Sequence, residues 1–291
     1  MVGNILVRAL MEKRSFDLKL ERAHEHLDSL DTEVRKWIDT EPYGIVDEPD
    51  PEIPPKPLPG NVRARRFRVD RVSDVPGRIS IIIGDCVFNL RSGLDHLALA
   101  LGQKFTTNMS DTQISGSQFP IFWKQSGFNK CAPDYVGCVS PAAMASIKSL
   151  QPYQRGKGYS SHPLWQLNEL NRIDKHRKLT SMISDYTIID PPTGKRVKGV
   201  AYVYREGQNW DAAQWHYFLI SPGVFKLNTV LARWAGVPVD PHSEMRLEPA
   251  VHPDVVFDKG GVASLQPVVP LLKSLCDFVG KDVIAKLSQF L

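Results

Sequence analysis

The sequence is poor in cysteine, in long apolar runs and in excess charge of either sign. Its 291 residues include four cysteines, Cys86, Cys131, Cys138 and Cys276, and no two of them form a CxxC motif. Such spacing suits buried, reduced thiols and predicts a cytoplasmic protein. A net charge of +4 permits a polyanionic partner without requiring one.

Long apolar segments are also missing. The run 79–87 is too short to span a bilayer. The N-terminal stretch has Arg8 inside its apolar part and lacks a small-residue cleavage site, so it is a poor signal peptide. We therefore expect no membrane partner. A hydrophobic content of 42% in a chain of this length predicts a globular protein of one large domain or two smaller ones.

Four segments have the apolar spacing of helices: 5–39, 78–102, 141–150 and 163–179. The second is the most regular, because its apolar residues step by four, three, four, three and four from Ile83 to Leu101. The segment 103–135, which lies between predicted helices, is expected to be irregular.

Two unusual segments separate the first two helices. Seven prolines and several acidic residues fall within 41–60, which predicts an extended loop, because proline fixes φ and removes a hydrogen-bond donor. The segment 63–72 alternates like a strand and holds the densest basic cluster of the chain, namely Arg63, Arg65, Arg66, Arg68 and Arg71. Either it is an edge strand protected by charge, or it binds nucleic-acid phosphates.

After residue 181 the pattern changes to the period of strands, and a last helix is expected over about 265–290. These features predict an α+β fold, in which a helical bundle core is followed by a β-rich part and a C-terminal helix. The expected domains are a helical core, 1–180, and a β-rich part with the C-terminal helix, 181–291.

Two helical segments carry Asn, Arg, Asp and His in the same order. The members of this N-R-D-H constellation are Asn89, Arg91, Asp95 and His96 in one segment and Asn171, Arg172, Asp174 and His176 in the other. Glu169 precedes His176 by seven residues and shares its predicted helical face. Buried polar groups cost free energy unless they are partnered. A site that combines them is therefore the first place to look for function.

The residues alone leave three uses of this constellation open. Ion pairs such as Arg91 with Asp95 would lock two helices in register. Alternatively, the constellation would bind a small anion or a nucleotide without catalysis. Carboxylates and histidines from two helices could also form a metal-dependent hydrolase, although the chain has no HExxH motif.

The pair Arg91 and His96 forms R-x4-H, which resembles the signature of HEPN domains. This resemblance implies a helical bundle, a homodimer and a metal-independent endoribonuclease or RNA-binding protein of a defence or toxin type. Arg91 would hold phosphate and His96 would transfer protons. The other constellation residues would orient them or contact substrate, and the arginine strand would attract the RNA backbone. No cofactor and no metal ligand are expected.

A wider pattern, NLRSGLDH, then LQPY, then NELNRIDKHR, is similar to a family of uncharacterised bacterial proteins. That similarity implies that these segments form a shared core and implies no reaction.

Overall fold

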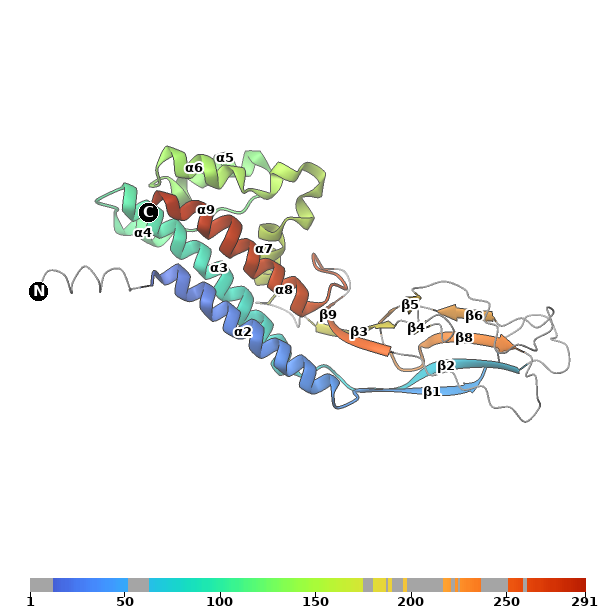
Figure 1. The fold of residues 1–291 in the computed structure, drawn as a ribbon. Coiled ribbons are helices and arrows are strands. Elements are labelled where there is room, and N and C mark those ends of the chain that lie inside the picture. The colour runs from blue at the N-terminus through green and yellow to red at the C-terminus, as the bar shows by residue number, and fades with distance from the viewer. Residues whose placement is uncertain are drawn as a thin grey trace, which may run out of the picture. The chain divides into compact units, whose positions relative to one another are not determined.

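The computed structural model describes residues 13–51, 63–174, 180–186, 188–189, 196–197, 217–220, 223–224, 226–236, 251–258 and 261–291. The chain forms two compact units. A helical unit comprises 1–33, 76–180 and 257–291, and a sheet unit comprises 34–75 and 181–256. The α+β class is confirmed (Figure 1).

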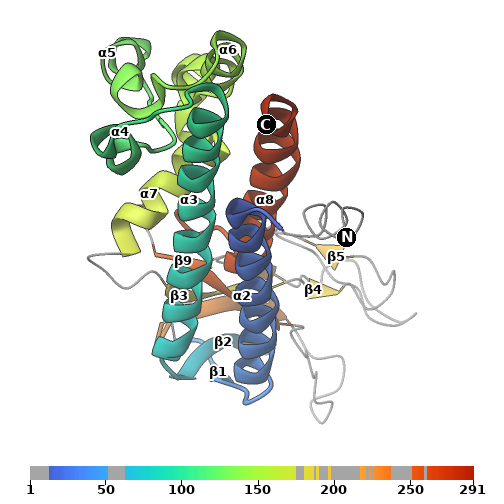
Figure 2. The same cartoon turned by 90° about the vertical axis from the view of Figure 1, so that its left-hand side faces the viewer.

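The helical unit is built on two long helices, α2 (Ser15–Ile38) and α3 (Gly77–Phe105). They lie side by side in both cartoon views (Figure 2). Gly93 permits a close approach, because a Cβ there would lie 3.3 Å from the Lys19 Cβ. The predicted stripe of α3 forms the core, since Ile83, Leu94 and Leu97 have no exposed surface.

Shorter helices follow α3: α4 (Asp111–Gly116), α5 (Gln125–Val136), α6 (Pro141–Ser149), the 3-10 segment η1 (Pro152–Ser161) and α7 (Pro163–Asp174). The predictions of α6 and of α7 as far as Asp174 are confirmed. The prediction of an irregular 103–135 is wrong at α4 and α5. Ser110 and Gln113 form a capping box on α4. In α5, the buried residues Phe128, Ala132 and Val136 form a helical stripe despite Pro133.

The C-terminal helix is confirmed and belongs to the helical unit. It consists of α8 (Val268–Asp277), a π-helical turn η2 (Phe278–Ile284), α9 (Ala285–Leu287) and a final 3-10 turn η3 (Ser288–Phe290). Val268, Leu272 and Val283 are fully buried. This membership differs from the expected division, because the apolar face of the last helix packs on α3 and α7.

In the sheet unit, four antiparallel strands lie in the order β1-β2-β8-β6. Their bounds are Tyr43–Pro49, Arg63–Val72, Val230–Gly236 and Tyr217–Ile220. A continuous loop over 41–60 is therefore a wrong prediction at β1, which holds no proline between Tyr43 and Glu48. The prediction of β2 as a strand is confirmed, but β2 is internal, so the edge-strand interpretation is wrong.

The remaining strands are short. A three-stranded sheet has the order β7-β3-β9, with bounds Gly223–Val224, Thr180–Tyr186 and Val251–Phe257. A two-stranded ladder joins β4 (Ile188–Ile189) and β5 (Arg196–Val197). The proposed change to strand periodicity after 181 is confirmed at these segments.

Candidate functional site

Arg91 and Asp95 form an ion pair that holds the chain segment around Phe119 onto α3. The Arg91 guanidinium donates to Asp95 Oδ1 at 2.7 Å and to the Phe119 carbonyl oxygen at 2.9 Å. Asp95 Oδ1 also accepts from the Phe119 N–H at 2.8 Å. The pair thus satisfies both backbone polar groups of a residue that is completely buried.

Gln151 binds the next residues of the same segment. Its side-chain oxygen accepts from the Phe122 N–H at 3.0 Å, and its side-chain nitrogen donates to the Pro120 carbonyl at 2.8 Å. Gln151 is completely buried. The NLRSGLDH and LQPY segments therefore meet at residues 119–122 in one polar clamp, defined here as Arg91, Asp95 and Gln151 around these residues.

The clamp lies in a low-dielectric environment. Burial lowers the pKa of Arg91, against the attraction of Asp95, and burial raises the pKa of Asp95, against the attraction of Arg91 and the Phe119 N–H. The Arg91 side chain keeps 13% of its surface exposed. Breaking the Arg91–Asp95 pair would leave a largely buried charge without a partner. The Arg91 guanidinium is therefore well suited to hold the backbone of Phe119 in place.

His96 and Asn89 lie on either side of the clamp on α3. His96 is partly exposed. The Asn89 side chain donates to the Asp85 carbonyl at 2.8 Å, and its oxygen lies 3.4 Å from Lys19 Nζ. Asn89 therefore links α3 to α2.

The second half of the constellation does not join the first among the described residues. Arg172 donates to Glu169 at 2.7 Å and is 64% exposed, whereas Glu169 is 17% exposed. Asn171 is partly exposed on the same helix. His176 lies outside the described residues.

Asp174 marks the place where α7 approaches α3. Its carboxylate lies against Gly84, where an added Cβ would collide with both carboxylate oxygens. Burial and the neighbouring Asp85 raise the pKa of Asp174. The two N-R-D-H segments are thus on helices that pack together. Among the described residues, Asp174 approaches α3 at Gly84, which precedes the first segment.

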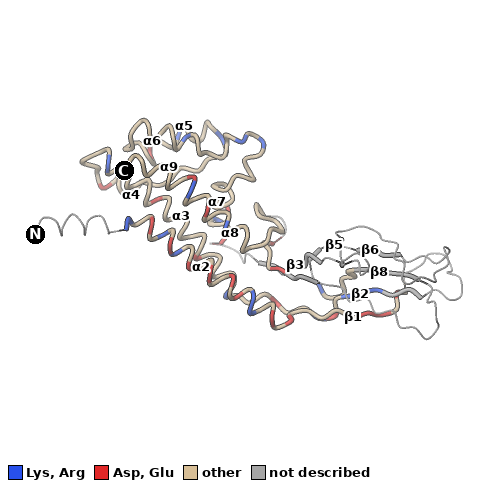
Figure 3. Tube along the Cα trace, viewed as in Figure 1, with Lys and Arg blue, Asp and Glu red and all other residues tan. Residues whose placement is uncertain are grey.

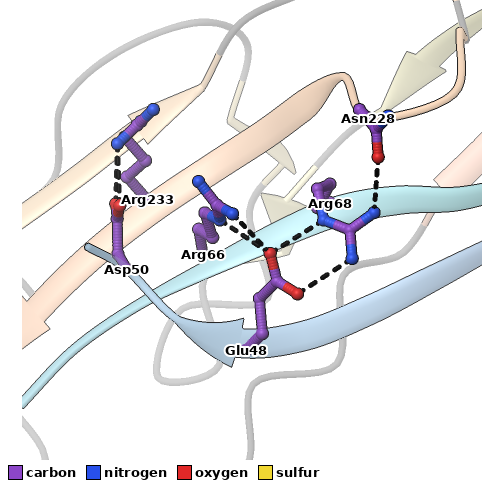
Figure 4. Close-up of polar contacts among 6 residues, drawn as sticks. All are labelled: Glu48, Asp50, Arg66, Arg68, Asn228 and Arg233. Carbon is purple, nitrogen blue, oxygen red and sulfur yellow. Dashed lines mark hydrogen bonds and ion pairs between the residues drawn. The ribbon is translucent and has the colours of Figure 1, made fainter. Parts of the chain in front are cut away.

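Two arginines of β2, Arg66 and Arg68, form ion pairs with Glu48 of β1 (Figure 4). Glu48 accepts from Arg68 through both carboxylate oxygens, at 2.8 and 2.9 Å, and from Arg66 at 2.7 Å. These bonds lower the pKa of Glu48 to about 2, with Arg68 the larger cause. Arg68 also donates to Asn228 at 2.9 Å.

A further ion pair of an acid with an arginine lies in the same sheet. Asp50, whose side chain has no exposed surface, accepts from Arg233 of β8 at 2.9 Å through both oxygens (Figure 4). Arg71 donates to the carbonyl oxygens of Glu41 and Tyr43. The side chains of Arg63 and Arg65 lie outside the described part of the structure. Two acids of the proline-rich stretch therefore have arginine partners in this sheet: Glu48 pairs with Arg66 and Arg68 of β2, and Asp50 pairs with Arg233 of β8.

The helical unit contains a second basic region, which the motifs of the sequence did not predict. The stretch 117–168 holds five basic residues, Lys124, Lys130, Lys148, Arg155 and Lys157, and Asp134 is its only acid. Its formal charge thus equals that of the whole chain. All five are exposed residues, and none has an ion pair within the part of the chain that the structure describes. Figure 3 marks the positions of Lys and Arg along the trace in blue. A local charge balance along the sequence would have revealed the stretch.

An aromatic cluster, Trp123, Tyr159 and Trp165, lies in the same stretch. The Trp123 and Tyr159 rings stack at 5.2 Å between centroids, and Tyr159 meets Trp165 edge to face at 5.5 Å. Lys124 Nζ lies 4.2 Å from the centroid of the Trp123 ring. Trp123 remains 43% exposed.

Two further features bear on binding. A cavity of about 670 Å³ between α3, α4 and α5 is lined by Asp134 and neutral residues such as Thr112 and Gln113, without Lys, Arg or His. This lining does not favour an anion. In the described ranges, no three His, Cys, Asp or Glu residues are grouped as metal ligands.

None of the helices in the described residues is both long enough and apolar enough to cross a membrane. Comparison with known proteins found no matching family model, no matching curated protein and no matching solved structure.

Proposed function

We propose that this protein is a cytoplasmic, HEPN-like RNA-binding protein whose helical unit holds the RNA. The observation that carries the proposal is the exposed basic stretch 117–168, in which five cations face a single acid. Exposed cations without an acidic partner can neutralise phosphates, and the release of condensed counterions then favours binding.

The β2 arginines contribute less than the sequence alone suggests. Glu48 binds Arg66 and Arg68, so a phosphate would have to compete with a carboxylate that already makes charge-assisted bonds. This competition moves the proposed phosphate contacts from the sheet unit to the helical unit.

In this proposal, Arg91 and Asp95 position backbone and do not touch RNA. Their bonds to Phe119 fix the segment that leads directly to Trp123 and Lys124. The R-x4-H pair would thus support the binding region through the fold.

Metal-independent RNA cleavage is the second candidate. It is favoured by one observation, the partly exposed His96 next to the Arg91–Asp95 pair. Incubation of wild type and His96→Ala with total RNA in EDTA tests it. Cleavage by wild type alone would support His96 as a proton-transfer group, and equal results would remove this candidate.

The HEPN resemblance also implies a homodimer. Ile81 and Phe88, two turns apart on α3, are 65% and 54% exposed. An apolar pair on the motif helix would be covered in such a dimer. The mass of the protein in solution, measured by light scattering, tests this part of the proposal.

The binding proposal is tested by fluorescence anisotropy with a labelled RNA in EDTA. The test variant replaces Lys124, Arg155 and Lys157 with Gln, and the matched control replaces Arg66 and Arg68 with Gln. We expect the first to weaken RNA binding and the second to leave the affinity of the folded protein nearly unchanged. Absence of RNA binding by wild type, or equal losses in the two variants, would contradict the proposal.

A further inference from the structure

We infer that Trp123, Tyr159 and Trp165 form a base-stacking site for single-stranded RNA. This inference rests on the proposed RNA-binding function and names the form of RNA and the place where it binds. The ligand is a single strand because an aromatic ring can stack only on the accessible face of a base. In a duplex, each base face is covered by the adjacent base pairs.

The geometry of the cluster suits this use. The stacked pair Trp123 and Tyr159 and the edge-to-face contact to Trp165 fix the three rings against one another. Rings held in this way lose little conformational entropy on binding. Trp123 nevertheless keeps 43% of its surface exposed, so a ligand can reach it.

Two elements position the rings. Trp123 follows the segment that the polar clamp holds, since Gln151 binds the Phe122 N–H at 3.0 Å. Tyr159 lies in η1, and Trp165 lies in the first turns of α7, whose start is fixed by buried His162 accepting from the Leu164 N–H at 3.2 Å. The cluster therefore rests on ordered backbone on both sides.

In the free protein, the Lys124 ammonium group lies over the Trp123 ring, with Nζ 4.2 Å from the ring centroid. A cation–π contact at an exposed site is weaker than the stacking of a base on a tryptophan. An incoming base can therefore displace the ammonium group, which then lies within reach of the phosphate attached to that base.

Charge around the cluster complements a nucleic-acid backbone. Arg155 and Lys157 are exposed residues of η1, the segment that carries Tyr159, and Lys124 follows Trp123 directly. No acidic residue occurs between Tyr135 and Asn168. Aromatic rings with interleaved cations are the composition of single-strand binding surfaces.

The experiment compares an unstructured single-stranded RNA with its duplex, using wild type, Trp123→Ala, Trp123→Phe and the control Phe105→Ala. Phe105 ends α3 and is 57% exposed, so it tests the loss of an exposed aromatic ring outside the cluster. We expect wild type to prefer the single strand. Trp123→Ala should lose about tenfold or more in single-strand affinity, Trp123→Phe should lose less, and Phe105→Ala should lose nothing.

Circular dichroism and thermal unfolding establish that each variant is folded, and Trp123→Phe keeps a ring in place if the alanine variant is unstable. The stacking site would be overturned, while RNA binding stays intact, by equal affinity of wild type for the single strand and the duplex. It would also be overturned if wild type, Trp123→Phe and Trp123→Ala all bind the single strand with the same affinity. Absence of binding to either RNA would overturn both proposals.

Discussion

The two basic regions of this protein differ in whether the fold itself uses their charge. In the sheet unit, Glu48 accepts from Arg66 and Arg68, and Asp50 accepts from Arg233. In the helical unit, the five basic residues of 117–168 are exposed, and Asp134 is the only acid in that stretch of sequence. Density of arginine along a sequence therefore does not indicate where a polyanion binds, because a charge that is already paired has less to gain from a phosphate.

Arg91 belongs with the paired cations although it lies in the helical unit. Its burial and its bonds to Asp95 and Phe119 give it a structural task. The protein thus has some charges that are paired within the fold and others that remain exposed.

Arg91→Ala should have the largest effect on stability. It leaves the partly buried Asp95 without its partner and the buried Phe119 carbonyl without its donor, which should cost about 2 kcal/mol of unfolding free energy. The control is Arg78→Ala on the same helix, since Arg78 is 70% exposed and lies 3.5 Å from Glu33. That exposed pair should contribute less than about 1 kcal/mol.

Chemical denaturation of both variants provides the measurement. If Arg91→Ala unfolds like Arg78→Ala and the folded variant no longer binds RNA, Arg91 would be a phosphate ligand and not a positioning residue.

Glu48→Gln should change how stability depends on pH. The pKa of Glu48 is lowered from its ordinary value of 4.5 to about 2 in the folded protein. Its ionised form therefore stabilises the fold above pH 4.5, and this contribution is lost as the pH falls toward 2. The variant should unfold at a lower temperature near neutral pH, and its melting temperature should fall less on acidification.

Thermal unfolding of wild type and Glu48→Gln across this pH range checks the prediction. Parallel acid profiles for the two proteins would mean that Glu48 does not hold Arg66 and Arg68 in solution.

Tyr153→Phe should have the smallest effect. The buried Tyr153 hydroxyl has no hydrogen-bond partner among the described residues, and its ring packs on Phe128 at 5.9 Å. Removing an unsatisfied hydroxyl should leave stability unchanged or raise it by up to about 1 kcal/mol. A clear loss of stability on denaturation would reveal a partner that the hydroxyl binds in solution.

The sequence predicted those elements whose signal is local and periodic. The stripe from Ile83 to Leu101 and the alternation of β2 follow directly from the residues that must be buried. In contrast, β1 was predicted as loop, because its flanking prolines dominate the composition, while it pairs with β2 across the proline-rich segment, from Pro49 with Arg65 to Tyr43 with Val72. Helix α5 was missed because Gly127 and Pro133 are weak helix formers and only the buried positions reveal it.

The candidate site was predicted in part. The i,i+4 spacing predicted the Arg91–Asp95 ion pair, which the structure contains, but spacing along one helix cannot show that both side chains also bind the backbone of Phe119. Likewise, no pattern links Trp123 to Tyr159, since the contact joins the bend before α5 to the 3-10 segment η1, which only packing brings together. Tertiary partners decide which charges and rings remain available to a ligand.

The most direct test of this account is the salt dependence of single-stranded RNA binding. The logarithm of the dissociation constant is measured against the logarithm of salt concentration for wild type, the Lys124/Arg155/Lys157 triple glutamine variant and the Arg66/Arg68 double glutamine variant. If the exposed cations bind phosphate, the triple variant should lower the slope by about 2, and the double variant should keep the wild-type slope. A slope that falls in the double variant and stays unchanged in the triple variant would contradict the account.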